Sequence, residues 1–292
     1  MSKEEEYDPI AYWRRRAERH ISEGIGVVVA SGSSPFVSRV IHRLEERGLK
    51  RAIAGIPLQG RVSLDAGCGI GRWFPLLEGA GGRVVGCDVV PLLLTECRRR
   101  RPGVPVTAGD VRSLPFRDSV FDVVLTVKVL QCIPRADQPS AVGELCRVLR
   151  PGGYLLLMEA MGRAKEGDTG RGSRHIFPNR PEEWIEMARR GGAYCLGWFG
   201  VDYMPVDRGL EIIRRAIYRL LHPLGSPKGA YSNDRSDTAL QGAWRHLHNG
   251  YLIAKWMALH VSLGLEPLFS CLMPRRWASH GMFIFRKRGQ ED

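Results

Sequence analysis

One short stretch, residues 62–72, constrains the fold of this chain more than any other. It reads Val-Ser-Leu-Asp-Ala-Gly-Cys-Gly-Ile-Gly-Arg, an apolar run that ends in an acid and continues into three alternating glycines. The apolar run predicts a buried parallel strand, and the glycines predict a turn whose backbone can approach a ligand closely. We therefore expect an α/β fold in which this turn cradles a nucleotide-like ligand.

The spacing of the glycines distinguishes between two classes of cofactor. The dinucleotide fingerprint needs its third glycine one position later, where this chain has Arg72, and it does not usually place an acid two residues before the first glycine. A carboxylate there would repel a pyrophosphate but suits a cofactor with a cationic amino-acid end. The turn therefore favours S-adenosylmethionine (SAM) over NAD. The predicted cofactor contacts in this stretch are Asp65, Gly67, Cys68, Gly69 and Gly71.

The run Asp-Ala-Gly-Cys-Gly-Ile-Gly at residues 65–71 matches the first motif of the class I SAM-dependent methyltransferases, and the sequence resembles that family, in particular its type 11-like members. Residues 144–158 resemble the family's fifth-strand signature, with a helix, a Pro-Gly-Gly turn and an apolar strand. The resemblance implies an α/β fold with a Rossmann-like, doubly wound sheet of seven strands, the last of them antiparallel at residues 280–285. It also implies SAM as the cofactor and S-adenosylhomocysteine as the product.

Acids at the ends of the next two predicted strands extend the resemblance. Asp88 ends a strand over residues 83–88, where its carboxylate can accept hydrogen bonds from the ribose hydroxyls, with Val89 beside it. The competing interpretation makes Asp88 a helix cap before Pro91. Asp110 ends a strand over residues 104–111 and, by resemblance, bonds the adenine amino group, while the backbone of Val111 meets the adenine ring.

The strand predicted over residues 121–127 is apolar enough to be buried on both faces, as in the centre of a parallel sheet. By resemblance, Val127 and Lys128 lie near the methionine part of SAM. Lys128 departs from the family pattern, because a cation near a sulfonium is electrostatically unfavourable. We therefore expect its side chain to point away and only its backbone to contribute.

Two helices are predicted before the first strand, over residues 8–23 and over residues 34–47, the second stopped by Gly48. Resembling proteins place such a segment over the SAM site as a lid, which implies that Tyr12 and Trp13 contact the cofactor or the acceptor. The alternative is that these aromatic rings only pack the helix onto the core.

The resemblance and the chain order divide the sequence into four parts. Residues 1–60 form an N-terminal helical lid, and residues 61–200 form the SAM-binding core. Residues 201–275 form a helical insertion between strands six and seven that caps the acceptor, and residues 276–292 hold the last strand and a tail.

The insertion and the segment before it supply the candidates for acceptor chemistry. Trp244 and Tyr251 recur with helical spacing and would line an acceptor cavity, although they could equally pack the helices on the sheet. If the acceptor is a hydroxyl, a base helps to remove its proton, and histidine is the natural choice. His175 and His248 are the candidate bases, with His246 nearby, although a lone histidine is more often structural.

Composition excludes several other classes of protein. Seven scattered cysteines without a Cys-x-x-Cys pair argue against a disulfide framework or a zinc site, and we expect no metal. The acidic N-terminus lacks the apolar core of a signal peptide, and no uncharged run reaches the length of a membrane span, so we expect a cytoplasmic protein without a transmembrane segment. The net charge of +12 allows nucleic acid as a partner. However, the arginines at 98–101 fit a helix C-terminus equally well.

These observations favour a methyltransferase that acts on O, N or C of a small, fairly apolar acceptor. The Asn/Asp-Pro-Pro-Tyr motif of amino-methylating nucleic-acid enzymes is missing, and no Pro-Cys pair supplies a nucleophile for cytosine. Two alternatives stay open: an RNA or protein methyltransferase that uses the basic C-terminal face, and a non-catalytic SAM-binding module. The sequence specifies neither the acceptor nor the oligomeric state.

Overall fold

The computed structural model describes residues 7–29, 35–162, 175–201 and 278–289, together with positions 264, 265, 268, 272, 274 and 275. The chain divides into two compact units. One comprises Met1–Asp202 with Pro274–Asp292, and the other comprises Tyr203–Met273. The helices and strands discussed below all belong to the first unit.

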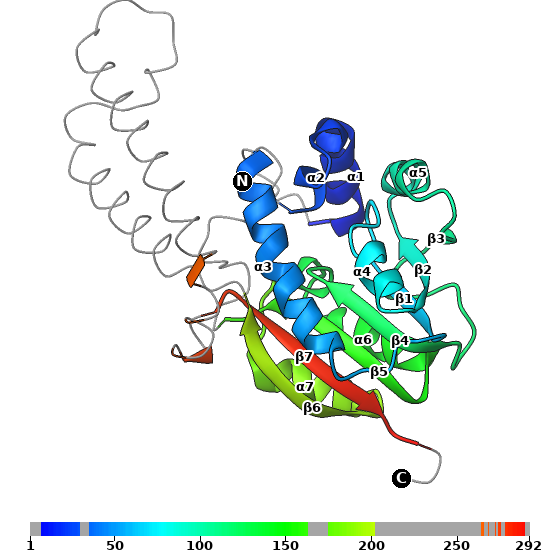
Figure 1. The fold of residues 1–292 in the computed structure, drawn as a ribbon, viewed down its shortest axis with the longest axis vertical. Helices are drawn as coiled ribbons and strands as arrows, with labels where there is room; N and C mark the ends of the chain where they lie inside the picture. The colour runs from blue at the N-terminus through cyan, green and yellow to red at the C-terminus, as the bar shows by residue number, and fades with distance from the viewer. Residues whose placement is uncertain are drawn as a thin grey trace, which may run out of the picture. The chain divides into compact units, whose positions relative to one another are not determined.

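A single mixed sheet of seven strands organises the described residues of this unit, in the order β3-β2-β1-β4-β5-β7-β6 (Figure 1). Neighbouring strands from β3 to β5 are parallel, and β7 runs antiparallel to both β5 and β6. The predicted seven-stranded, doubly wound sheet with an antiparallel last strand is confirmed. The strands are β1 (Val62–Ala66), β2 (Arg83–Asp88), β3 (Val106–Ala108), β4 (Phe121–Val127), β5 (Leu149–Ala160), β6 (Ala193–Val201) and β7 (His280–Lys287).

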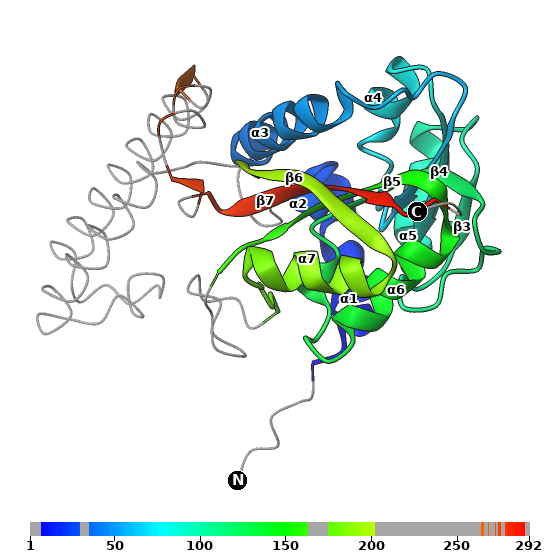
Figure 2. The ribbon, with the colours of Figure 1, turned by 90° about the horizontal axis from the view of Figure 1, so that it is seen from below.

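Helices cover both faces of the sheet, as Figure 2 shows with α3 and α4 on one side and α6 and α7 on the other. The short helices α1 and α2 lie with α5 at one end of the sheet (Figure 1). The helices are α1 (Pro9–His20), α2 (Gly26–Val29), α3 (Pro35–Ile53), α4 (Phe74–Gly79), α5 (Pro91–Arg100), α6 (Gln138–Val148) and α7 (Pro181–Arg190), with single 3₁₀ turns at η1 (Ile21–Glu23) and η2 (Leu130–Cys132).

Side chains of the central strands alternate between the two faces of the sheet and contribute to two hydrophobic cores. In β5, Leu155 and Leu157 pack with α6 and α7, whereas Leu156 and Met158 pack with α3, α4 and α5 on the opposite face. Successive side chains of a strand point to opposite faces, so a run that is apolar at every position must be covered twice. The unbroken apolar sequence of β4 and β5 therefore dictates the two helical layers.

The structure corrects the predicted end of the second helix. Gly48 does not stop α3, which continues to Ile53. Gly48 is buried, and a Cβ atom there would lie 2.8 Å from Cγ2 of Val201 in β6. The glycine thus allows α3 to approach the sheet closely, and tertiary packing outweighs its low helix propensity.

Other boundaries shift by a few residues. The helix predicted over residues 8–23 ends at His20 and continues as the 3₁₀ turn η1, and the strand predicted over residues 104–111 is reduced to Val106–Ala108. The Pro-Gly-Gly sequence at 151–153 lies inside β5 instead of preceding it. None of these shifts changes the order of the elements.

Candidate active site

A cavity opens at the carboxyl ends of β1, β2, β3 and β4 and is partly covered by α1 and α2. It has about 900 Å³ of empty space, its open mouth included. The sheet order reverses between β1 and β4, and open α/β sheets bind ligands at such a switch point. Among the predicted cofactor contacts, those that line it are Gly67, Cys68, Gly69, Asp88, Val89, Asp110, Val111, Val127 and Lys128.

The glycine turn after β1 forms the floor of the cavity. Gly67 and Gly69 have φ of 79° and 54°, in the left-handed region that favours glycine. A Cβ atom on Gly67 would lie 2.2 Å from Cγ2 of Val129, and one on Gly69 would lie 2.8 Å from Cγ1 of Val28 in α2. Gly71 does not line the cavity, and its missing side chain makes room for Cys97 of α5 instead.

Asp88 connects the turn to β2. Its Oδ2 accepts a hydrogen bond from the backbone N–H of Gly69 at 2.8 Å, and its Oδ1 accepts one from Val90 at 2.9 Å. Burial raises the pKa of Asp88, although these N–H groups oppose the shift. Val90, not Asp88, occupies the cap position of α5. Each carboxylate oxygen can accept further bonds, so Asp88 can serve the turn and a ligand in the cavity together.

Asp65 differs from Asp88 in its placement. It is fully buried in β1 and does not line the cavity, and its Oδ2 has no hydrogen-bond partner among the described residues. Burial raises the pKa of Asp65 to about 7, against the opposing charge of Arg72. The acid predicted to meet the amino-acid end of the cofactor is therefore buried outside the cavity lining.

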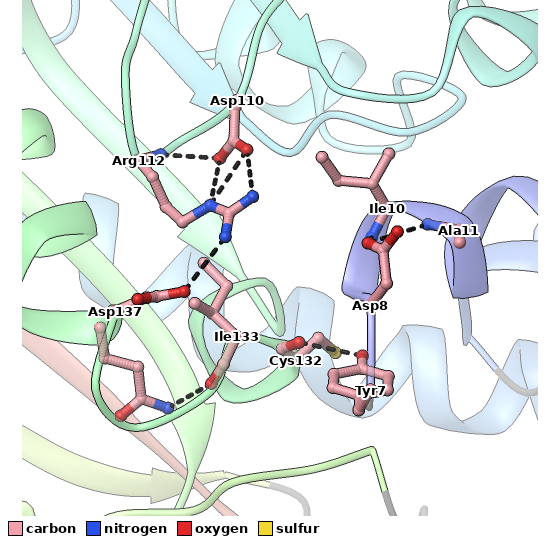
Figure 3. Close-up of polar contacts among 10 residues, drawn as sticks. Tyr7, Asp8, Ile10, Ala11, Asp110, Arg112, Cys132, Ile133 and Asp137 are labelled. Atoms are coloured by element: carbon pink, nitrogen blue, oxygen red, sulfur yellow. Dashed lines mark hydrogen bonds and ion pairs between the residues drawn. The ribbon is translucent and has the colours of Figure 1, made fainter. Parts of the chain in front are cut away.

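An arginine engages the acid that was predicted to bind adenine (Figure 3). The guanidinium of Arg112 donates to Asp110 from Nε at 3.0 Å and from Nη2 at 2.6 Å, and it donates to Asp137 from Nη1 at 3.1 Å. Burial acts to raise the pKa of Asp110, but the hydrogen bonds from Arg112 hold the pKa below its usual value. Arg112 lines the cavity, and sequence reasoning missed it.

The cavity wall after β4 contains a buried ion cluster. Lys128 has φ of 61°, rare for a residue with a side chain, and its Nζ pairs with Glu45 of α3. Nη1 of Arg72 donates to the other oxygen of the same carboxylate. Burial acts to raise the pKa of Glu45, but Arg72 and Lys128 lower the pKa to about 2. Nothing in the sequence marks Glu45 as a site residue, because it is only one charged residue on the inner face of a helix.

A second buried acid fixes the loop that follows. Glu159 of β5 accepts hydrogen bonds from the backbone N–H groups of Val129, Leu130 and Gln131, at 3.2, 3.1 and 3.0 Å. Burial raises the pKa of Glu159 to about 8, against those donors. This carboxylate anchors η2, the segment from which Cys132 and Ile133 reach the cavity.

The N-terminal segment contributes apolar and aromatic side chains. Trp13 lines the cavity, whereas Tyr12 does not. The ring of Tyr12 lies 4.4 Å from His175 and the ring of Tyr7 lies 4.7 Å from it, measured between centroids, and the hydroxyl of Tyr7 donates to the carbonyl of Cys132 at 3.0 Å (Figure 3). His175 thus sits in an aromatic cluster beside the cavity wall instead of lining the cavity.

Several predicted residues lie outside the described part of the chain, namely Trp244, His246, His248 and Tyr251. Within the described ranges, no three His, Cys, Asp or Glu side chains are placed to hold a metal ion. No described helix combines the length and apolarity needed to cross a membrane.

The fold and the cavity together define a doubly wound α/β protein with a nucleotide-type site at its switch point. Residues 64–157 match the methyltransferase domain family. The chain is 35% identical over 134 residues to malonyl-[acyl-carrier protein] O-methyltransferase of Serratia marcescens and 34% identical over 117 residues to demethylmenaquinone methyltransferase of Streptomyces avermitilis. These matches cover 44% and 40% of this chain. The chain spans about half the length of both relatives, 52% and 49%.

A solved structure supports the fold over a longer stretch. Magnesium protoporphyrin IX methyltransferase from Synechocystis PCC 6803, crystallised with bound SAM, superposes with a TM-score of 0.54 at 18% identity, covering 68% of this chain and 93% of that one. Residues 64–157 are therefore a methyltransferase domain of the class I SAM-dependent type, with SAM as its cofactor.

Proposed function

We propose that the protein transfers the methyl group of SAM to an O, N or C atom of a small, fairly apolar acceptor. The observation that carries the proposal is the division of the cavity into two kinds of wall. The sheet side presents the glycine turn, Asp88 and Asp110, and the lid side presents Ile10, Trp13 and other apolar groups. A polar nucleoside fits the first wall, and an apolar acceptor fits the second.

Each part of the cofactor has a proposed partner. The carboxylate of Asp88, with the backbone of Val89, takes the ribose hydroxyls. Asp110 and Val111 lie where adenine would be held, and Arg112 keeps the Asp110 carboxylate ionised and oriented. The methionine part lies over Gly67 and Gly69, with the β4 end beside it. Figure 3 shows the Asp110 side of this arrangement.

The chain's own contribution to catalysis is positioning and exclusion of water. SAM supplies an electrophilic methyl on a sulfonium, which an acceptor lone pair must approach from the side opposite the sulfur. Holding both partners in line supplies much of the acceleration in such reactions. Trp13 and Ile10 of α1 and Val28 of α2 cover the cavity with apolar surface and keep water from the reacting atoms.

A general base is needed only for some acceptors. Tyr7 touches both His175 and the carbonyl of Cys132, a cavity-wall residue, so one side chain separates the imidazole from the cavity wall. His175 is the candidate base within the described residues if the acceptor is a hydroxyl. A pH–rate profile that loses its acidic limb in His175→Gln supports this role, and an unchanged limb rejects it.

The name of one relative supports the acceptor class, because demethylmenaquinone is a small, largely apolar quinone. The test is incubation of the purified protein with methyl-labelled SAM and cell extract. The proposal predicts label in the small-molecule fraction that partitions into organic solvent. Label confined to RNA or protein rejects this acceptor class, and the absence of any transfer on every fraction rejects the activity.

A further inference from the structure

Two cations and one carboxylate form a buried cluster at the end of the cavity away from Asp110. The side chains of Glu45, Arg72 and Lys128 are 0%, 6% and 15% exposed. The three residues are far apart in the sequence: Glu45 lies in α3, Arg72 follows the glycine turn, and Lys128 follows β4. Arg72 and Lys128 line the cavity, whereas Glu45 stands behind them. A ligand in the cavity would therefore meet the cations and not the acid.

The cluster holds more hydrogen-bond donors than its acid can use. A guanidinium has five N–H donors and an ammonium has three. Among the described residues, Arg72 donates only from Nη1, to Glu45, and Lys128 pairs with the same carboxylate. The guanidinium plane is held over the ring of Trp73 at 4.3 Å. Buried cations whose donors are incompletely matched are costly, and an anion with two oxygens would relieve that cost.

Backbone geometry indicates that the position of Lys128 matters. Lys128 is held at φ of 61°, a conformation that costs roughly 1–3 kcal/mol in a residue with a side chain and that clusters at ligand sites. Its backbone N–H donates to Met158 of β5 at 2.8 Å, which fixes the residue at the end of the sheet. The fold thus maintains a strained backbone in order to place an ammonium group on the cavity wall.

The place of the cluster along the cavity selects the ligand group. Arg72 follows the glycine turn directly, and Lys128 precedes Val129, whose side chain packs on Gly67. This is the end of the cavity assigned above to the methionine part of SAM, opposite the nucleoside end at Asp88 and Asp110. The amino-acid end of SAM carries a carboxylate, which is the anion that a guanidinium and an ammonium recognise best.

We propose that Arg72 and Lys128 bind the α-carboxylate of the methionine part of SAM, and that Glu45 is a positioning residue that holds the two cations for it. This inference rests on the proposed function, because it assumes SAM in this cavity. With the ligand bound, two cations face two carboxylates, so Lys128 can stand near a sulfonium without a net repulsive charge. A carboxylate of an acceptor could use the same donors, and binding measured without acceptor separates the two sources.

The test compares two ligands on each protein. Calorimetry measures the dissociation constants of S-adenosylhomocysteine and of its decarboxylated analogue, which keeps the ammonium and lacks only the carboxylate. The full chain is used in the wild-type form and as Arg72→Met and Lys128→Met, each of which leaves Glu45 one cationic partner. Arg150→Met is the matched control, because it removes a guanidinium that pairs with Asp122 and does not line the cavity. Each preparation serves as its own reference, so a partly unfolded sample does not change the ratio.

Wild-type protein and Arg150→Met should prefer S-adenosylhomocysteine over the analogue by at least about tenfold, as expected for hydrogen bonds between charged groups. In Arg72→Met and in Lys128→Met that preference should shrink several-fold or vanish. If either variant keeps the full wild-type preference for S-adenosylhomocysteine over the analogue, the carboxylate assignment is overturned. It is also overturned if the wild-type protein binds the two ligands equally well. Failure of the wild type to bind either ligand would instead overturn the proposed function itself.

Discussion

Replacing Gly67 by alanine should damage the cofactor site more than the same change at Gly60. Both glycines are left-handed, with φ of 79° and 72°, so both variants pay a similar backbone strain of roughly 1–2 kcal/mol. A Cβ on Gly60 meets nothing within 4 Å, whereas one on Gly67 would lie 2.2 Å from Cγ2 of Val129. Overpacking of this kind costs roughly 1–3 kcal/mol more. The two variants should therefore differ in unfolding free energy by about that amount.

Urea unfolding measures the difference in unfolding free energy, and calorimetric titration with S-adenosylhomocysteine measures the dissociation constant. Because Val129 forms part of the cavity wall and Gly67 part of its floor, Gly67→Ala should weaken binding by at least about tenfold, or 1.4 kcal/mol. Gly60→Ala should leave the dissociation constant unchanged. Equal stability losses in the two variants, or wild-type affinity in Gly67→Ala, would refute the claim that close approach of the turn builds the site.

Three further outcomes are expected. Gly143→Ala should raise the unfolding free energy by about 1 kcal/mol through helix propensity, because its Cβ meets nothing within 4 Å. Gly48→Ala should show no gain, or a loss of up to about 2 kcal/mol, because overpacking opposes that gain; thermal melts check both. The pKa of Glu45 is held near 2, so its stabilising effect should be complete above the usual value of about 4.5 and fade as pH drops toward 2, and the stability difference from Glu45→Gln should shrink over that range. Asp88→Asn should weaken S-adenosylhomocysteine binding by roughly 10- to 100-fold, whereas Asp122→Asn, at the amino end of β4, should not, by calorimetry.

The sequence predicts the sheet well because its signals are local and repeated. Apolar runs of strand length, each followed by an acid or a glycine turn, specify β1, β2 and β4 and place their ends together, since parallel strands end at one edge. The antiparallel β7 followed from the family resemblance, not from periodicity. The polar side of the site was predictable for the same reason, because Asp88 and Gly67 lie next to the strands that position them.

The remaining parts of the site depend on contacts that no local pattern encodes. Glu45, 27 residues before Arg72 in the chain, reaches Arg72 and Lys128 only because α3 packs across the sheet. The sequence alone predicts Gly48 as a helix stop, and only the structure shows that Val201 packs closely against it. Arg112 could have been found, since an arginine two residues after an acid at a strand end can fold back onto that acid in a bidentate pair. Asp65 shows the converse, because its position in the motif did not reveal that it is buried outside the cavity lining.

The central claim is that the cavity at the carboxyl ends of β1, β2 and β4 holds the nucleoside of SAM. The most direct measurement is a crystal structure of the protein with S-adenosylhomocysteine. We predict ribose hydroxyls within hydrogen-bond distance of the Asp88 carboxylate and adenine beside Asp110. Ligand density elsewhere, or a nucleoside in this cavity without a contact to Asp88, would contradict the account.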